Sequence, residues 1–227
     1  MEVDYIENGN CLDLMKTLPD NCIDLTVTSP PYDNLRAYNG YSFDFENVAK
    51  QLYRITKEGG VIVWVVSDAT IDGSETGTSF RQALYFKDIG FNLHDTMIFA
   101  KTNPIPYNHN RYDPCFEYMF ILSKGKPKTF NGIRIQCETS GNEYNRIKAN
   151  ELDKKQCMRV RDENMVVGET KLHTNIFYYS IGGVQPDTRP CFHNNLRMMR
   201  FIHGQIKVNW YLIRFWVPVP LLLKLYI

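Results

Sequence analysis

The feature that most constrains the fold is an alternation of short apolar runs with stretches of helical periodicity. Four runs rich in branched apolar residues are typical of buried strands: residues 23–28, 61–67, 93–100 and 116–123. Residues 45–55 and 78–89 repeat apolar side chains at helical spacing. Glycines follow both stretches, Gly59 and Gly60 the first and Gly90 the second, where helices commonly end. The alternation predicts an α/β fold with a parallel sheet and helices on its faces.

Length and composition limit the classes of protein. Of 227 residues, 44% are hydrophobic and 22% charged, and 26 Lys and Arg face 25 Asp and Glu. These values predict one folded domain, or one with a small insert, and exclude a disordered chain or a uniformly basic nucleic-acid coat. The 6 cysteines form no C-x-x-C pair, so we expect free thiols, a cytoplasmic location and no metal site. The sequence contains neither a signal-peptide core near its start nor an apolar run that spans a bilayer, so no membrane role is expected.

The residues that carry chemistry directly follow the first predicted strand. Thr28 is followed by Ser29, Pro30, Pro31 and Tyr32, and ligands of open parallel sheets bind beyond the carboxyl ends of strands. Two prolines fix φ and remove two N–H donors, which leaves carbonyl oxygens and Ser29 to accept hydrogen bonds from an exocyclic amine. Tyr32 offers a face for base stacking, worth roughly 1–3 kcal/mol. The alternative is a Pro-Pro turn that ends the strand, with a packing tyrosine.

The segment T-S-P-P-Y resembles motif IV of the amino-directed DNA methyltransferases, which methylate cytosine N4 or adenine N6. Three further segments are similar to the same family: residues 12–23 before the motif, 55–68 with T-K-E-G-G, and 116–128. The resemblance implies a Rossmann-like methyltransferase sheet with helices on both faces, incomplete at the C-terminus. It also implies a permuted order, with the catalytic loop near the N-terminus.

In this family, the equivalents of Ser29, Pro30, Pro31 and Tyr32 receive a base flipped out of double-stranded DNA. The resemblance therefore implies that these four residues form the catalytic loop. Serine at the first motif position favours cytosine N4 slightly, and both target bases remain open.

The resemblance further implies S-adenosylmethionine as cofactor, held by a turn that reads D-P-F-x-G-S-G-T. The chain has no such turn in its reading frame. G-S-E-T-G-T at residues 73–78 lacks the pattern and is interpreted as a polar loop that caps the helix beginning near Ser79. Asn10, after Gly9, lies where the permuted family often places a residue near the adenine ring of the cofactor. A simple turn is the alternative interpretation of Asn10.

The tail has an unusual composition. No acidic residue follows Asp187, although six Lys or Arg do. When residues 212–222 are read with each codon begun one base earlier, the allowed codons permit D-P-F-L-G-S-G-T-T, the expected cofactor turn. We therefore hypothesise a one-base frameshift near residues 185–187. A genuine, unusual C-terminal segment is the alternative.

These patterns predict three parts. Residues 1–128 are the catalytic half of a methyltransferase domain, residues 129–175 a basic target-recognition insert, and residues 176–227 a remnant of the cofactor region, out of frame after about 186. The predicted function is site-specific methylation of double-stranded DNA, with a cognate restriction enzyme or a complementing downstream polypeptide as further partners. The alternatives are an inactive frameshifted remnant, one half of a split enzyme, and a methyltransferase of RNA or small molecules. Three histidines are expected to be structural: His94, His109 and His173.

Overall fold

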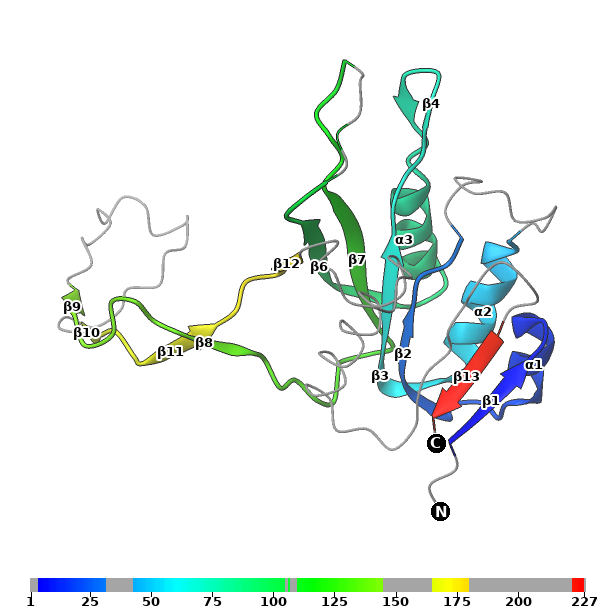
Figure 1. Cartoon of the computed structure of the whole chain (residues 1–227). Helices are drawn as coiled ribbons and strands as arrows, with labels where there is room; N and C mark the ends of the chain where they lie inside the picture. Colours follow the sequence, from blue (N-terminus) through cyan, green and yellow to red (C-terminus); the bar gives the residue numbers. More distant parts are fainter. Residues whose placement is uncertain are drawn as a thin grey trace, which may run out of the picture. The chain divides into compact units, whose positions relative to one another are not determined.

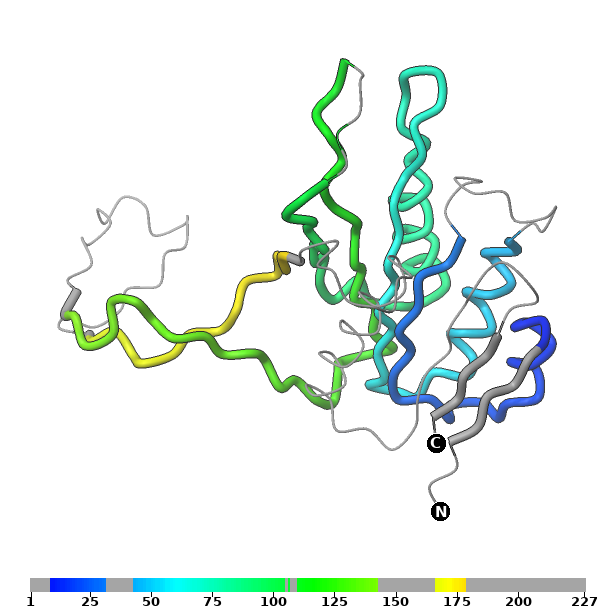
Figure 2. Tube along the Cα trace, in the orientation of Figure 1, coloured from blue at the N-terminus to red at the C-terminus, as the bar shows by residue number. Residues whose placement is uncertain are grey.

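The computed structural model describes residues 4–31, 43–104, 106, 110–144, 165–179 and 222–226. The chain divides into two compact units, residues 1–130 with 175–227, and residues 131–174. Figure 1 labels the helices and strands, and Figure 2 traces the chain in the same orientation.

The larger unit is built on a five-stranded sheet with the order β12-β6-β7-β3-β2. Its strands are β2 (Ile23–Thr28), β3 (Thr56–Val66), β6 (Asn92–Lys101), β7 (Phe116–Ser123) and β12 (Ile176–Tyr179). β2 runs parallel to β3 and β12 parallel to β6, but β7 is antiparallel to both of its neighbours. The prediction of a purely parallel sheet is therefore wrong for β7. β7 directly follows β6 among the described elements, so the chain returns without a helical crossover.

Three described helices pack on one face of this sheet. They are α1 (Cys11–Thr17), α2 (Phe45–Ile55) and α3 (Thr78–Asp88). Each contributes to a single core: Met15 from α1, Leu52 from α2 and Phe86 from α3 are fully buried with Trp64 of β3. The rings of Trp64 and Phe86 lie 5.0 Å apart, and the Trp64 Nε1–H donates to Gln82 Oε1 at 2.8 Å. The prediction of helices on both faces is thus met on one face by the described helices.

The predicted helix and strand positions agree with these elements, with one exception at a helix end. Gly59 and Gly60 lie within β3 and do not end α2, which ends at Ile55 because Thr56 already has extended backbone. Gly59 has φ 78°, and a Cβ there would lie 2.5 Å from Lys128 Cγ, so the close approach of another segment requires glycine. Gly90, with φ 114°, follows α3 as predicted.

Short two-stranded ladders complete the description. In the larger unit, β1 (Asp4–Asn8) pairs with β13 (Leu222–Tyr226), and β4 (Thr70–Ile71) pairs with β5 (Ser74–Glu75). In the smaller unit, β8 (Arg134–Gln136) pairs with β11 (Thr170–Leu172), and β9 (Glu143–Tyr144) with β10 (Met165–Val166). All four ladders are antiparallel. Most of the tail that is predicted to be out of frame, residues 180–221, lies outside the described residues.

Candidate functional site

The T-S-P-P segment lies at the carboxyl end of a buried strand. Thr28, the last residue of β2, pairs with Trp64 of the parallel strand β3, so the two strands end at the same edge of the sheet. Pro30 is buried, whereas Ser29 and Pro31 are half-buried. The structure thus brings these three predicted site residues together in one partly buried loop. Tyr32 lies outside the described residues.

This loop is rich in acceptors and poor in donors. Neither Pro30 nor Pro31 has an N–H, so the backbone here offers carbonyl oxygens without competing donors. Burial of Pro30 and the fixed φ of both prolines limit the motion of the loop. Such a rigid array suits a ligand that presents N–H groups, for example an amine on an aromatic ring.

Two threonine hydroxyls beside the loop were not singled out by sequence reasoning. Thr26 Oγ1 and Thr28 Oγ1 are buried, and neither has a hydrogen-bond partner in the described part of the chain. Both side chains share a sheet face with Ile62 and Trp64, their register partners on β3. A buried hydroxyl without a partner costs about 1–3 kcal/mol. Alternating threonines within an apolar strand were the available sequence signal.

A polar network fixes the segment that follows β3. The Asp68 carboxylate accepts from the Ser79 backbone N–H at 2.8 Å, from Ser79 Oγ at 2.5 Å and from Thr76 Oγ1 at 3.3 Å. Gly77, the N-cap residue of α3, has no side chain that could accept from the first backbone N–H groups of the helix. Asp68, eleven residues before Ser79, accepts from the Ser79 N–H in its place. The prediction that residues 73–78 form a polar loop that caps this helix is therefore wrong: Ser74 and Glu75 form β5, and the side chain that caps the helix is Asp68, outside that segment.

Asn10 has a local structural role. It is the N-cap of α1, and its Oδ1 accepts from the Leu12 backbone N–H at 2.9 Å. Its side-chain oxygen therefore accepts a hydrogen bond within its own segment, which agrees with the alternative interpretation of Asn10 as a turn residue. Among the described residues Asn10 is the only predicted cofactor contact, and the Gly-rich turn is not present there. The predicted remnant of the cofactor region, residues 176–227, lies mostly outside the described residues.

Burial dominates the resolved pKa shifts. It raises the pKa of the Cys11 thiol to about 12, and it also raises the pKa of the Cys22 thiol. Burial, followed by the negative charges of Asp68 and Glu75, raises the pKa of the Tyr118 phenol. These three groups are therefore protonated at neutral pH.

The structure shows no metal-binding arrangement in the ranges that it describes. No group of three His, Cys, Asp or Glu side chains is close enough there to hold an ion. His94 is exposed, His173 Nδ1 lies 2.7 Å from the Thr174 carbonyl oxygen, and His109 is outside the described ranges. The four described cysteines, Cys11, Cys22, Cys115 and Cys137, are free thiols, as predicted. No described helix has the length and apolar character needed to cross a membrane.

The smaller unit consists of antiparallel ladders with exposed side chains. Arg134 Nε donates to Thr170 Oγ1 at 2.8 Å, and Arg134 Nη2 donates to the Thr170 carbonyl oxygen at 2.9 Å, which links β8 to β11. Lys171 and Leu172 of β11 are exposed. Residues 129–175, the predicted target-recognition insert, include this unit, and their role stays a prediction.

The fold is a mixed sheet with helices, and a Ser-Pro-Pro loop of hydrogen-bond acceptors lies at the carboxyl ends of its strands. Comparison with known protein families identifies the class of protein to which this arrangement belongs. The family model described as DNA methylase, of N6 and N4 specificity, matches residues 23–187, and this chain belongs to that family. The predicted family is thereby confirmed.

The chain is similar to two curated methyltransferases. It is 67% identical over 118 residues to the orphan methyltransferase M.BamHII of Bacillus amyloliquefaciens, which covers 52% of this chain and 44% of that protein. It is 26% identical over 164 residues to the type II methyltransferase M.SfiI of Streptomyces fimbriatus, which covers 58% of this chain and 39% of that protein. The chain thus spans less than half the length of these relatives.

A solved structure has a similar fold. The PvuII DNA methyltransferase, described as cytosine-N4-specific, matches with a TM-score of 0.62 at 15% identity, over 92% of this chain and 72% of that chain. This likeness confirms the predicted methyltransferase fold.

Proposed function

We propose that this chain is the base-binding part of an S-adenosylmethionine-dependent DNA methyltransferase. Its substrate is double-stranded DNA, and the methyl group is transferred to the exocyclic amine of a flipped cytosine (N4) or adenine (N6). The observation that carries the proposal is the T-S-P-P loop at the carboxyl end of buried β2, within the residues that match the DNA methylase family. The protein acts in the cytoplasm.

The loop prepares the amine for reaction. The amine nitrogen of a base is a poor nucleophile, because its lone pair is delocalised into the ring. Carbonyl oxygens of the Pro30–Pro31 segment and the Ser29 side chain accept hydrogen bonds from the N–H groups of the amine, which raises electron density on its nitrogen. Tyr32 stacks on the flipped base and compensates part of the unstacking cost, which is a few kcal/mol. S-adenosylmethionine, when bound, supplies the methyl group.

The remaining parts have supporting roles in this proposal. Asn10 would lie near the adenine ring of bound S-adenosylmethionine, and residues 129–175 form the target-recognition region, whose basic side chains, such as Lys171, contact DNA phosphates. A cognate restriction enzyme and a complementing downstream polypeptide stay predictions.

The test is the modification state of a host genome. The gene, with one base restored near codon 186 and with its natural downstream sequence, is expressed in bacteria that lack cytosine-N4 and adenine-N6 methylation, and modified bases are mapped by single-molecule sequencing. We expect one modified base type at one short sequence, and none with the Pro31→Ala or Tyr32→Ala variant. Modification that persists in both variants would contradict the role of the loop.

A further inference from the structure

The β4–β5 hairpin projects from the same edge of the sheet as the T-S-P-P loop. β2 and β3 are parallel neighbours, and the hairpin begins after the carboxyl end of β3 (Figure 1). Adjacent strands lie about 4.8 Å apart. The hairpin therefore starts one strand away from the proposed base-binding loop.

The hairpin is short and tightly built. Asp72 and Gly73 form its two-residue turn with φ 48° and 78°, the left-handed pair that matches the twist of a hairpin. Pairing continues from Ile71 and Ser74 down to the Thr76 N–H, which donates to the Ala69 carbonyl at 2.9 Å. Four residues on each side give a ribbon roughly 10 Å long. The major groove of DNA is about 8.5 Å deep and admits a two-stranded ribbon.

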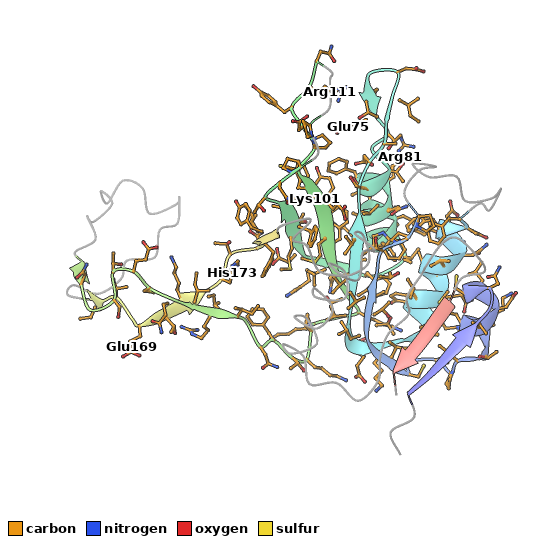
Figure 3. The ribbon with its side chains drawn as sticks, in the orientation of Figure 1. Glu75, Arg81, Lys101, Arg111, Glu169 and His173 are labelled. Atoms are coloured by element: carbon orange, nitrogen blue, oxygen red, sulfur yellow. The ribbon has the colours of Figure 1, made fainter. Side chains whose placement is uncertain are left out.

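Polar contacts hold the hairpin at both ends. At its base, Thr76 contacts Asp68 and accepts from Arg81 Nη2 through its carbonyl at 2.6 Å. At its tip, Arg111 donates to the Gly73 carbonyl oxygen, and Arg111 Nη1 lies 3.9 Å from Glu75 Oε1 (Figure 3). Arg111 belongs to the segment that follows β6. Because β6 and β3 are both antiparallel to β7, they run in the same direction, and the segments after them leave the sheet at the same edge.

Both faces of the hairpin are exposed, and Arg111 contacts one of them. Cross-strand partners share a face, so Thr70 and Glu75 lie on the side that Arg111 approaches, and Ile71 and Ser74 lie on the other. Ile71 is 58% exposed, so its side chain is accessible to a partner on the face that Arg111 does not contact. An apolar group contacts the thymine methyl, and a hydroxyl donates to or accepts from base edges.

We propose that the Ile71/Ser74 face of the β4–β5 hairpin enters the major groove of the DNA duplex and contacts base edges beside the flipped base. This inference rests on the proposed function. The hairpin, residues 70–75, contains no Lys or Arg, so it does not act by neutralising phosphates. Its acidic tip residue, Asp72, suits the amine of a cytosine, and Arg111 lies beside the second acid, Glu75.

The experiment measures the affinity of the full chain at several salt concentrations, by fluorescence anisotropy, for a 30-base-pair duplex that carries the sequence found modified in the genome test. We expect the Ile71→Ala/Ser74→Ala variant to bind about tenfold more weakly, with an unchanged salt slope. Thr70→Ala, on the braced face of the same hairpin, is the matched control and stays within about twofold. Circular dichroism checks that all variants are folded.

A second measurement tests the same inference if the double variant fails to fold. A photocrosslinking amino acid at position 71 is expected to form an adduct with the labelled duplex, and one at position 70 is not. If the unmodified chain binds DNA but position 71 gives no adduct and the double variant keeps its affinity, the inference is wrong and the proposed function stands. If position 71 crosslinks only to protein in a cell extract, the hairpin is a protein contact and the inference is wrong. If the unmodified chain binds no duplex at any salt concentration, both fail.

Discussion

At the residue scale, the two buried threonines of β2 lead to a stability prediction. Thr26 Oγ1 is buried without a partner among the described residues, so Thr26→Val removes a desolvation cost without changing the volume of the side chain. We expect the variant to be more stable by about 1 kcal/mol in urea unfolding. Thr28→Val is the matched variant beside the loop. Destabilisation of either variant by more than about 1 kcal/mol would show that its hydroxyl is hydrogen-bonded.

Cys11 leads to a prediction about reactivity and pH. Its side chain is 2% exposed, and burial raises its pKa from 9.0 to about 12. The unfolded chain therefore loses this proton at lower pH than the folded chain, so the contribution of Cys11 to stability is complete below pH 9 and falls as pH rises toward 12.

Alkylation with iodoacetamide at pH 8, followed by peptide mapping, checks the first part of this prediction. We expect the half-buried Cys115 and Cys137 to be modified in the native protein, and Cys11 only after unfolding. Rapid native alkylation of Cys11 would contradict its burial.

At the element scale, Arg54 joins α2 to the end of α1. Its guanidinium donates to the carbonyl oxygens of Met15 at 2.7 Å and Leu18 at 2.9 Å, and to Asp20 Oδ1 at 2.5 Å. The Met15 carbonyl oxygen also accepts from the Leu18 backbone N–H at 3.1 Å, so Arg54 adds a second donor at the C-terminal end of α1. We expect Arg54→Ala to lower the free energy of unfolding by about 2 kcal/mol.

Arg54→Lys separates charge from geometry. Lysine keeps the charge but has no planar fork, so this variant is expected to lose about 1 kcal/mol. Lys50→Ala, at an exposed position of α2, is the control and stays within about 0.5 kcal/mol. Equal effects of Arg54→Ala and Lys50→Ala in urea unfolding would contradict the bridging role.

Some helices and strands could be predicted from the sequence with their exact bounds, because the patterns that indicate them lie within one segment of the chain. β2, β7 and α2 have their predicted bounds, since branched apolar runs and helical spacing are read within one segment. The direction of β7 depends on a connection without a helix, which alternation alone does not reveal. The β4–β5 hairpin has strands of only two residues, too short to show an alternating pattern, although Asp72-Gly73 is a typical hairpin turn.

The candidate site was predictable to a similar extent. Consecutive residues in one loop, Ser29, Pro30 and Pro31, were identified from the motif and from the strand before it. Contacts between distant segments were not, because Asp68 with Ser79 or Arg111 with Gly73 depends on the folded arrangement. Local patterns carry no information on such pairs.

At the scale of the whole molecule, the hypothesis of a frameshifted tail leads to a binding prediction. If the tail is out of frame, the chain lacks the Gly-rich turn, and purified protein of residues 1–227 shows no measurable binding of S-adenosylmethionine by isothermal titration calorimetry. A micromolar Kd would contradict the hypothesis. The nucleotide sequence across codons 180–227 and beyond checks it independently, because the shifted frame must remain open and encode D-P-F-L-G-S-G-T-T.

The central claim is that the Ser29–Tyr32 loop serves the methylation of an exocyclic amine in DNA. Its most direct test compares the genomes of methylation-free bacteria that express the gene as it stands, the gene with one base restored near codon 186, and the restored gene with Tyr32→Ala. The account predicts cytosine-N4 or adenine-N6 methylation at one short sequence with the restored gene alone. Modification by the unrestored gene would retain the function and refute the frameshift. Absence of modified bases from a folded, well-expressed restored protein would contradict the central claim.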